Sequence, residues 1–411
     1  MTVGTGFRAP GTGLMVFGGL LSALGAYLFQ VLGGRALGAE SFAPISVLWT
    51  MFFILGTVVL VPVEQHVTRE AASGRKVLTF HGLLPSLVAI LLATLVGTLF
   101  VLFNLERVFL GDETFLLVTL VLFTFYGLYE LARGLLAGHR RFGLVGWAMI
   151  GESTGRLTLA LGFLALAPEA ISLGWAMALG ALTVVGTRFW RFDHEAPSGS
   201  IAGSSKLLGV YVIGSGASQT LLAGAPLAVL ILGGGPELIS IAFVTFTLFR
   251  APLTLIYLLQ GRVLPYLVRM AESGDRTEAD RLISRLVAIG AALCLAGALT
   301  GYVAGADVVQ LLLGAEFRPS PQVAALVAGG VVAAVTTQVV GQFLVAGGRT
   351  AALTLVWSLG LVTAVVVLAV SSLEPLTRVA LAFALGELLA LTAMWLVSRR
   401  APVQEASPDG R

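Results

Sequence analysis

The stretch GLLPSLVAILLATLVGTLFVLF, residues 82–103, contains no charged side chain and is long enough to cross a bilayer as one helix. A helix needs about 20 apolar residues to span the hydrocarbon core, where it satisfies its own backbone hydrogen bonds in the absence of water. Similar stretches recur along the chain of 411 residues, of which 57% are hydrophobic and only 11% are charged. The sequence therefore excludes a water-soluble domain and predicts an all-α membrane protein that crosses the bilayer many times.

We predict about twelve membrane-spanning helices. The connections between them are short, which leaves no room for a catalytic domain outside the membrane. The expected spans are residues 14–33, 42–64, 82–103, 114–137, 144–166, 171–190, 207–232, 238–260, 282–304, 322–344, 352–372 and 376–397.

Positive charge falls mainly in every second connection. With the N-terminus in the cytoplasm, most of the 25 lysines and arginines lie on the cytoplasmic side, and the residues expected outside are Arg35, Arg107, Arg318 and Arg378. Such a bias sets the orientation of membrane proteins, so we expect both termini in the cytoplasm. Anionic head groups account for these bases, and no nucleic acid partner is expected. Arginine greatly outnumbers lysine, which favours a high-GC bacterium as the source, and we expect the protein in the plasma (inner) membrane of that bacterium.

The two halves of the chain resemble each other. Residues 137–140 read AGHR at the end of the fourth span, and residues 346–349 read AGGR at the end of the tenth. Between the halves, residues 191–206 are rich in Gly and Ser, which is typical of a flexible linker. We predict two pseudo-symmetric six-helix lobes related by an axis along the membrane normal. The expected domains are an N-terminal lobe at 1–190, a cytoplasmic linker at 191–206, a C-terminal lobe at 207–398 and a cytoplasmic tail at 399–411.

Charged side chains inside the predicted spans are the first candidates for a functional site. A charge at the bilayer centre costs at least about 2.5–3.5 kcal/mol, so it faces a cavity or a partner rather than lipid. The residues concerned are Glu130, Arg133, Glu152, Arg156, Arg250 and Glu387.

Two of these acids are close to a base on their own helix. Glu152 and Arg156 are four residues apart and share a helix face. They are either a self-neutralised structural pair, or Arg156 binds an anionic head group while Glu152 tunes it or carries a proton. Glu130 and Arg133 form a similar pair, in which Arg133 can instead reach the cytoplasmic interface.

Arg250 and Glu387 have no such neighbour. The charge of Arg250 must be balanced from another helix or by a substrate, and Pro252 loosens the helix beside it. A structural arginine is the alternative. Glu387, in the middle of the last span, is either a site of proton exchange or a neutral, hydrogen-bonded side chain.

Span seven is expected to be interrupted. Gly214, Gly216, Gly224 and Pro226 occur along it, and broken helices often border a transport pathway. Gln219 on this span, and Gln338 and Gln342 on span ten, can donate to sugar or phosphate oxygens, although bonds between helices are their commoner use. No motif for a catalytic site or a metal site is found, and the single cysteine, Cys294, is expected to be a small packing residue.

Several short motifs occur in an order typical of one superfamily. Residues 35–42 read RALGAESF, residues 250–252 read RAP, residues 264–266 read LPY, residues 312–317 read LLGAEF and residues 345–349 read VAGGR. In order and spacing they resemble the polysaccharide-transporter (Wzx-type flippase) branch of the multidrug/oligosaccharidyl-lipid/polysaccharide (MOP) exporter superfamily. Ala43 departs from that pattern, since a glycine is usual there.

This resemblance implies a MATE-like, V-shaped bundle whose lobes rock between inward-facing and outward-facing states. The implied cargo is an oligosaccharide on a polyprenyl pyrophosphate, moved to the outer leaflet without a cofactor by an H⁺ or Na⁺ gradient. Its implied partners are membrane lipid, the lipid-linked anionic glycan and other polysaccharide-assembly membrane proteins. On this basis the expected substrate-binding residues are Arg156, Arg250, Arg133, Gln219, Gln338 and Gln342, and the expected ion-coupling residues are Glu152, Glu387 and Glu130.

Other classes stay open at this point. The first is an ion-coupled drug or small-molecule exporter of the same superfamily. A peptidoglycan-precursor flippase usually has more spans and more basic residues in its first two helices. A major-facilitator transporter would carry an aspartate in the connection at 69–76, which reads REAASGRK. A membrane glycosyltransferase or polymerase would need a site on a sizeable loop, and a non-transporting scaffold would not need charges inside its spans.

Overall fold

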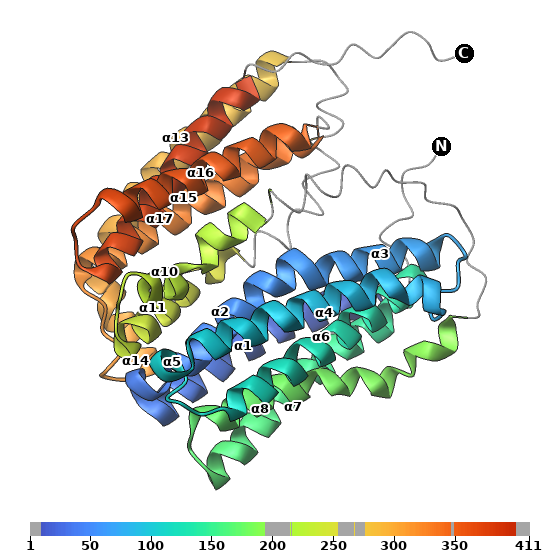
Figure 1. The fold of residues 1–411 in the computed structure, drawn as a ribbon. Coiled ribbons are helices and arrows are strands. Elements are labelled where there is room, and N and C mark those ends of the chain that lie inside the picture. Colours follow the sequence, from blue (N-terminus) through green and yellow to red (C-terminus); the bar gives the residue numbers. More distant parts are fainter. Residues whose placement is uncertain are drawn as a thin grey trace, which may run out of the picture. The chain divides into compact units, whose positions relative to one another are not determined.

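The computed structural model describes residues 10–193, 214, 216–253, 267, 276–346 and 349–399. These residues form helices joined by short turns and contain no strand, which confirms the all-α prediction (Figure 1). Contacts divide the chain into two compact units, which are considered separately below. The predicted linker lies outside the described residues after Asp193, as does the predicted tail after Arg399.

Ten helices of the described residues are long and apolar enough to cross a membrane. A further helix, α7 (Phe142–Leu166), has 25 residues. This helix is also long enough to cross a membrane, but it is less apolar than the ten because it contains Glu152 and Arg156. The first part of the predicted seventh span, 207–213, lies outside the described residues. The multi-pass architecture is therefore confirmed.

Unit 1 holds the first helices of the chain. Helix α6 packs against α3, α4 and α8, and α7 packs against α1 and α8 (Figure 1). The elements are α1 (Thr12–Ser41), α2 (Ala43–Leu55), a π-helical turn (Gly56–Leu60), α3 (Val61–Ala72), α4 (Phe80–Phe103), α5 (Leu105–Val108), α6 (Thr114–Gly138), α7, and α8 (Ala170–Gly180) with 3-10 turns at Ala181–Thr187 and Phe189–Phe192.

Two helices of unit 1 run past their predicted ends. Helix α1 was expected to stop at residue 33, but it continues to Ser41 with a kink at Gly38. Gly33 and Gly34 lie within this helix, where both are buried and leave room for neighbouring side chains. The second span was expected to end at 64, but the π-helical turn carries it on into α3. Glu64 therefore lies within a helix.

Unit 2 holds the last helices of the chain. Helix α17 packs against α15 and α16, and α13 packs against α15 (Figure 1). The elements are α10 (Ala225–Ile231), α11 (Pro236–Phe249) from Thr245 onward, α13 (Arg276–Thr300), a π-helical turn (Gly301–Gly305), α14 (Ala306–Leu313), α15 (Pro321–Ala346), α16 (Thr350–Val370) and α17 (Pro375–Arg399). The connection expected at 305–321 is thus helical as far as Leu313.

The interruption predicted in span seven is present. Residues 216–223 are helical, Gly224 is not, and α10 starts at Ala225 with Pro226 in its first turn. Proline has no N–H, so the carbonyl of Leu222, four residues earlier, lacks its usual helical donor. The break therefore leaves a backbone acceptor available within the membrane.

Residues 235–244 and 312–317 belong to unit 1 by their contacts, although both fall in the predicted lobe 207–398. The backbone N–H of Ala39 donates to Glu316 Oε2 at 2.8 Å, and Arg35 Nε donates to the carbonyl of Leu312 at 2.7 Å. Gly38 has φ 74°, and a side chain there would overlap the Glu316 carboxylate. The motifs at 35–42 and 312–317 thus contact each other in the structure. We call the bond between Glu316 and Ala39, together with the close approach of Gly38, the Glu316 contact.

Loss of the Glu316 contact should be measurable as a loss of stability. In Glu316→Ala the N–H of Ala39, a residue that is almost fully buried, loses its acceptor. We expect the free energy of unfolding to fall by about 1–3 kcal/mol in detergent denaturation. Glu374→Ala is the control, because the bond that the Glu374 side chain accepts from Thr377 is exposed to solvent. Equal effects of the two substitutions would contradict a structural role for Glu316.

Candidate functional site

A buried ionic cluster joins α6 and α7 in unit 1. Arg156 Nη1 donates to Glu152 Oε1 at 2.5 Å and to the hydroxyl of Tyr126 at 3.2 Å. The Tyr126 hydroxyl itself donates to Glu152. Glu152 and Arg156 are only 3% and 4% exposed, so neither charge is solvated. The structure thus brings together the two residues that the sequence paired.

Aromatic rings complete the surroundings of Arg156. Its guanidinium carbon lies 5.1 Å from the ring centroid of Trp49 and 5.7 Å from that of Phe29. The ring faces carry negative charge density and stabilise the cation where water is excluded. Among the described residues Arg156 Nε has no hydrogen-bond partner. The geometry favours the interpretation of a self-neutralised pair in this conformation.

Arg133 is bound by two acids rather than one. Its Nη1 lies 3.1 Å from Glu130 Oε2, and its Nη2 lies 3.1 Å from Glu64 Oε1. Gly134 allows this arrangement, because a Cβ there would lie 2.6 Å from the carbonyl oxygen of Glu64. With both acids ionised, the three side chains carry one excess negative charge. Such a group can accept a proton or a small cation.

The two clusters are continuous along one face of α6. The ring centroids of Tyr126 and Tyr129 are 5.7 Å apart, and the guanidinium carbon of Arg133 lies 5.4 Å from the ring centroid of Tyr129. Positions 126, 129, 130 and 133 follow the helical repeat of three to four residues. We call this set the α6–α7 network. Its members are Trp49, Glu64, Tyr126, Tyr129, Glu130, Arg133, Glu152 and Arg156.

Sequence reasoning missed Glu64, Tyr126 and Trp49. Glu64 was overlooked because the span was expected to end there, whereas the helix runs eight residues further. Tyr126 precedes Glu130 by one helical turn, and that spacing was the available signal. Trp49 had no local signal, because its partner Arg156 is remote in the sequence.

In unit 2, Arg250 meets the interrupted helix. Its Nη1 donates to the carbonyl of Leu222 at 3.2 Å, which is the acceptor that Pro226 leaves without a helical donor. Helix α11 ends at Phe249, one residue before the charge, in agreement with the predicted loosening near Pro252. Arg250 therefore receives a partner from another helix, as the sequence required.

Glu387 differs from Glu130 and Glu152, the other candidate acids of the predicted spans, because its carboxyl group forms no ion pair with a described residue. The residue is fully buried in α17, and neither side-chain oxygen has a hydrogen-bond partner among the described residues. Among the described residues, the hydrogen bond of the neutral alternative has no visible partner. A buried carboxyl without a partner is most stable when it is protonated or bound to a cation.

One of the three predicted glutamines, Gln338, joins two helical segments in this conformation. Gln338 Nε2 donates to Ser218 Oγ at 3.3 Å, which joins α15 to the helical residues 216–223. Gln342 Nε2 donates to the carbonyl of Gln338 at 3.3 Å. Gln219 lies in the same helical segment as Ser218 and is half-buried. The expected set thus lies in two groups, with Glu130, Arg133, Glu152 and Arg156 in unit 1 and Gln219, Arg250, Gln338, Gln342 and Glu387 in unit 2.

Several solved structures of MATE transporters have a similar fold. An inward-facing multidrug resistance MATE family transporter of the MOP superfamily matches with a TM-score of 0.66 and 13% identity, over 94% of this chain and 97% of that chain. The eukaryotic MATE transporter AtDTX14 matches with a TM-score of 0.59 and 13% identity, over 95% and 94%. A mutant of the Vibrio cholerae MATE transporter VcmN matches with a TM-score of 0.57 and 17% identity, over 95% and 96%.

The similarity defines the fold of this chain. No protein-family model matches the sequence, and no curated protein matches it significantly. The chain therefore has the all-α fold of MATE transporters over nearly its whole length, as the MOP resemblance implied.

Proposed function

We propose that this chain is an alternating-access transporter that moves a lipid-linked anionic oligosaccharide from the cytoplasmic to the outer leaflet. The observation that carries the transport assignment is the MATE-like fold, which extends over 94% of the chain. The buried ionisable groups support it, because charges inside spans are costly and are typical of substrate and ion pathways.

The cargo assignment is supported by the motifs at 35–42, 250–252 and 312–317. Arg250 is our candidate to meet a pyrophosphate, since it lies within a predicted span and donates to the Leu222 carbonyl beside the break before α10. Arg133 and Arg156 are paired with carboxylates in this conformation. We propose that they take part only when those acids become protonated and release them.

Glu387 is our candidate for ion coupling in unit 2. Because its carboxyl has no hydrogen-bond partner among the described residues, Glu387→Met should leave the free energy of unfolding unchanged or raise it by about 1–3 kcal/mol. We expect the same substitution to abolish the dependence of transport on an H⁺ or Na⁺ gradient. A stable variant that keeps full gradient dependence would remove Glu387 from the coupling.

Export of a drug or another small molecule is the second candidate. The observation that favours it is that one of the matching structures is named as a multidrug resistance transporter. An enzymatic role has no positive support.

A deletion strain separates the two candidates. If the cargo is a lipid-linked glycan, the strain should lose surface polysaccharide and accumulate the glycan on its polyprenyl carrier at the cytoplasmic leaflet, and a plasmid copy should restore both. If the cargo is a drug, surface polysaccharide should be normal while sensitivity to cationic drugs rises. That second result would overturn the proposed cargo.

A further inference from the structure

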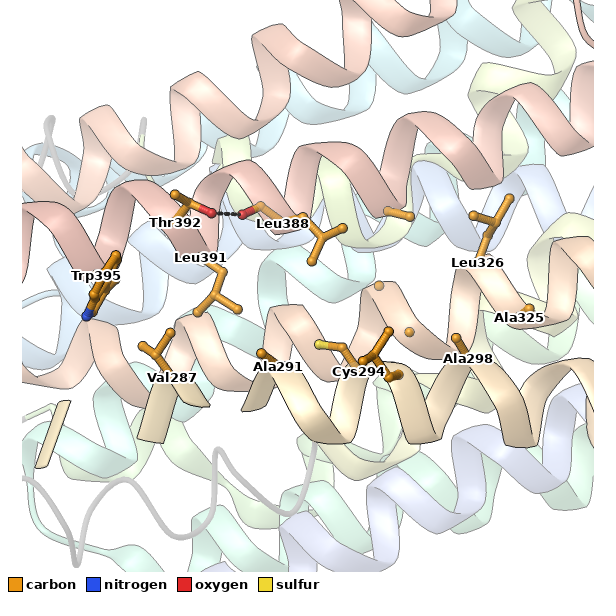
Figure 2. Close-up of a pocket in the computed structure, with 14 residues that line it drawn as sticks. Val287, Ala291, Cys294, Ala298, Ala325, Leu326, Leu388, Leu391, Thr392 and Trp395 are labelled. Atoms are coloured by element: carbon orange, nitrogen blue, oxygen red, sulfur yellow. Dashed lines mark hydrogen bonds between the residues drawn. The ribbon is translucent and has the colours of Figure 1, made fainter. Parts of the chain in front are cut away.

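An elongated apolar crevice lies between α13, α15 and α17 within unit 2 (Figure 2). Its volume of about 570 Å³ is in the range of pockets that hold small organic ligands. One of its few polar groups, the Thr392 hydroxyl, is already bonded to the Leu388 carbonyl at 2.8 Å. The crevice is therefore suited to hydrocarbon rather than to a sugar or a phosphate.

The length of the crevice matches one leaflet of a bilayer. Its lining extends from Val287 to Ala298 on α13 and from Trp395 to Ala384 on α17. Each stretch rises about 17 Å at 1.5 Å per residue, and half of a hydrocarbon core is about 15 Å. Figure 2 shows Val287 and Trp395 at one end, and Ala298 at the other.

The crevice is open along its side. Leu295 of α13 and Leu388 of α17 both line it, and they are 76% and 43% exposed. Since α13 and α17 belong to membrane-spanning helices, an open side between them gives a hydrocarbon chain lateral access.

Polar groups occur at the Trp395 end. Trp395 Nε1 is buried and has no hydrogen-bond partner among the described residues. One turn further along α17, the guanidinium carbon of exposed Arg399 lies 5.1 Å from the Trp395 ring centroid. An apolar slot with a donor and a cation at one end is complementary to an amphiphile with an anionic head.

We propose that this crevice binds one acyl chain of an anionic phospholipid from the leaflet nearest Arg399. The phosphate lies at Arg399, and an ester or phosphate oxygen accepts the Trp395 N–H. A phospholipid chain fits the depth of one leaflet, whereas a polyprenyl chain is longer than the crevice. This lipid is distinct from the proposed cargo.

Photocrosslinking tests the site on the purified, full-length chain. The protein is reconstituted with phosphatidylglycerol that carries a diazirine at the end of one acyl chain. After irradiation, crosslinks should occur in the α13 and α17 peptides that line the crevice. Ala291→Phe places a ring in the crevice and should reduce these crosslinks by roughly tenfold or more, because the ring takes the volume that the chain needs. Ala296→Phe, on another face of α13, is the matched control and should leave them unchanged.

The only cysteine of the chain gives a second measurement that needs no variant. Cys294 lines the crevice, so its alkylation by a small maleimide should be slow with bound phosphatidylglycerol and faster after exhaustive delipidation. This readout remains valid if Ala291→Phe fails to fold, which gel filtration would reveal.

The head group has its own test. Phosphatidylcholine with the same diazirine chain should crosslink less than phosphatidylglycerol, and Arg399→Gln should remove that difference. Equal crosslinking of Ala291→Phe and Ala296→Phe would overturn the site. Equal crosslinking of the two lipids, or displacement of the probe by an equimolar polyprenyl phosphate, would overturn the proposed occupant. These measurements require no transport, so their failure leaves the proposed function untouched.

Discussion

Replacing Glu152 by glutamine should lower the free energy of unfolding by about 3–5 kcal/mol, because it leaves the buried cation of Arg156 without its counter-charge. Arg156→Met should have an effect of similar size, since it leaves the carboxylate of Glu152 buried without its base. The double variant should be destabilised by much less than the sum of the two single effects. Denaturation of the purified protein in mixed detergents measures all three.

An exposed ion pair in unit 2 supplies the control for this cycle. Arg318 Nη2 lies 2.8 Å from Asp307 Oδ1, and the two side chains are 54% and 65% exposed. Disrupting it with Asp307→Asn should cost no more than about 1 kcal/mol. Strictly additive effects of Glu152→Gln and Arg156→Met would contradict the α6–α7 network as an energetic unit.

Replacing Arg250 by alanine should abolish export of surface glycan while the protein still inserts and accumulates normally. The substitution removes both a cation within the membrane and the donor to the Leu222 carbonyl at the break before α10. Arg250→Lys keeps the charge and one donor, so partial export is expected. Quantification of surface polysaccharide, together with immunoblots of the membrane fraction, measures the two effects separately.

Arg378→Ala is the matched control for Arg250, because Arg378 Nε also donates to a backbone carbonyl, that of Leu373 at 3.1 Å, but at the exposed start of α17. Its export should be normal. Unchanged export in Arg250→Ala would remove Arg250 from the mechanism.

The fold could be predicted from the sequence because bilayer physics acts locally. A run such as 82–103 has to be a helix wherever it lies in the membrane, and the observed helix α4, Phe80–Phe103, begins two residues before it and ends with it. Helix ends were less predictable. The first span was expected to end at residue 33, whereas in the fold Gly33 and Gly34 lie within α1 and are buried against other side chains.

The candidate site could be predicted only where its partners share a helix. Glu152 and Arg156 were paired by their spacing, and the structure confirms the contact. The contacts of Arg250 with Leu222, of Glu64 with Arg133 and of Glu316 with Ala39 join remote segments. Their partners depend on how the helices pack, which the spacing of residues within one helix does not encode.

The most direct test of the central claim is translocation by the purified protein in sealed proteoliposomes. A polyprenyl-pyrophosphate-linked oligosaccharide is incorporated into both leaflets, and a membrane-impermeant glycosidase added outside removes the exposed fraction. The account predicts that an imposed H⁺ or Na⁺ gradient exposes the protected fraction with wild-type protein, and that Arg250→Ala vesicles leave it protected. If wild-type vesicles leave the glycan protected under either gradient while they transport a cationic drug, the proposed cargo is contradicted.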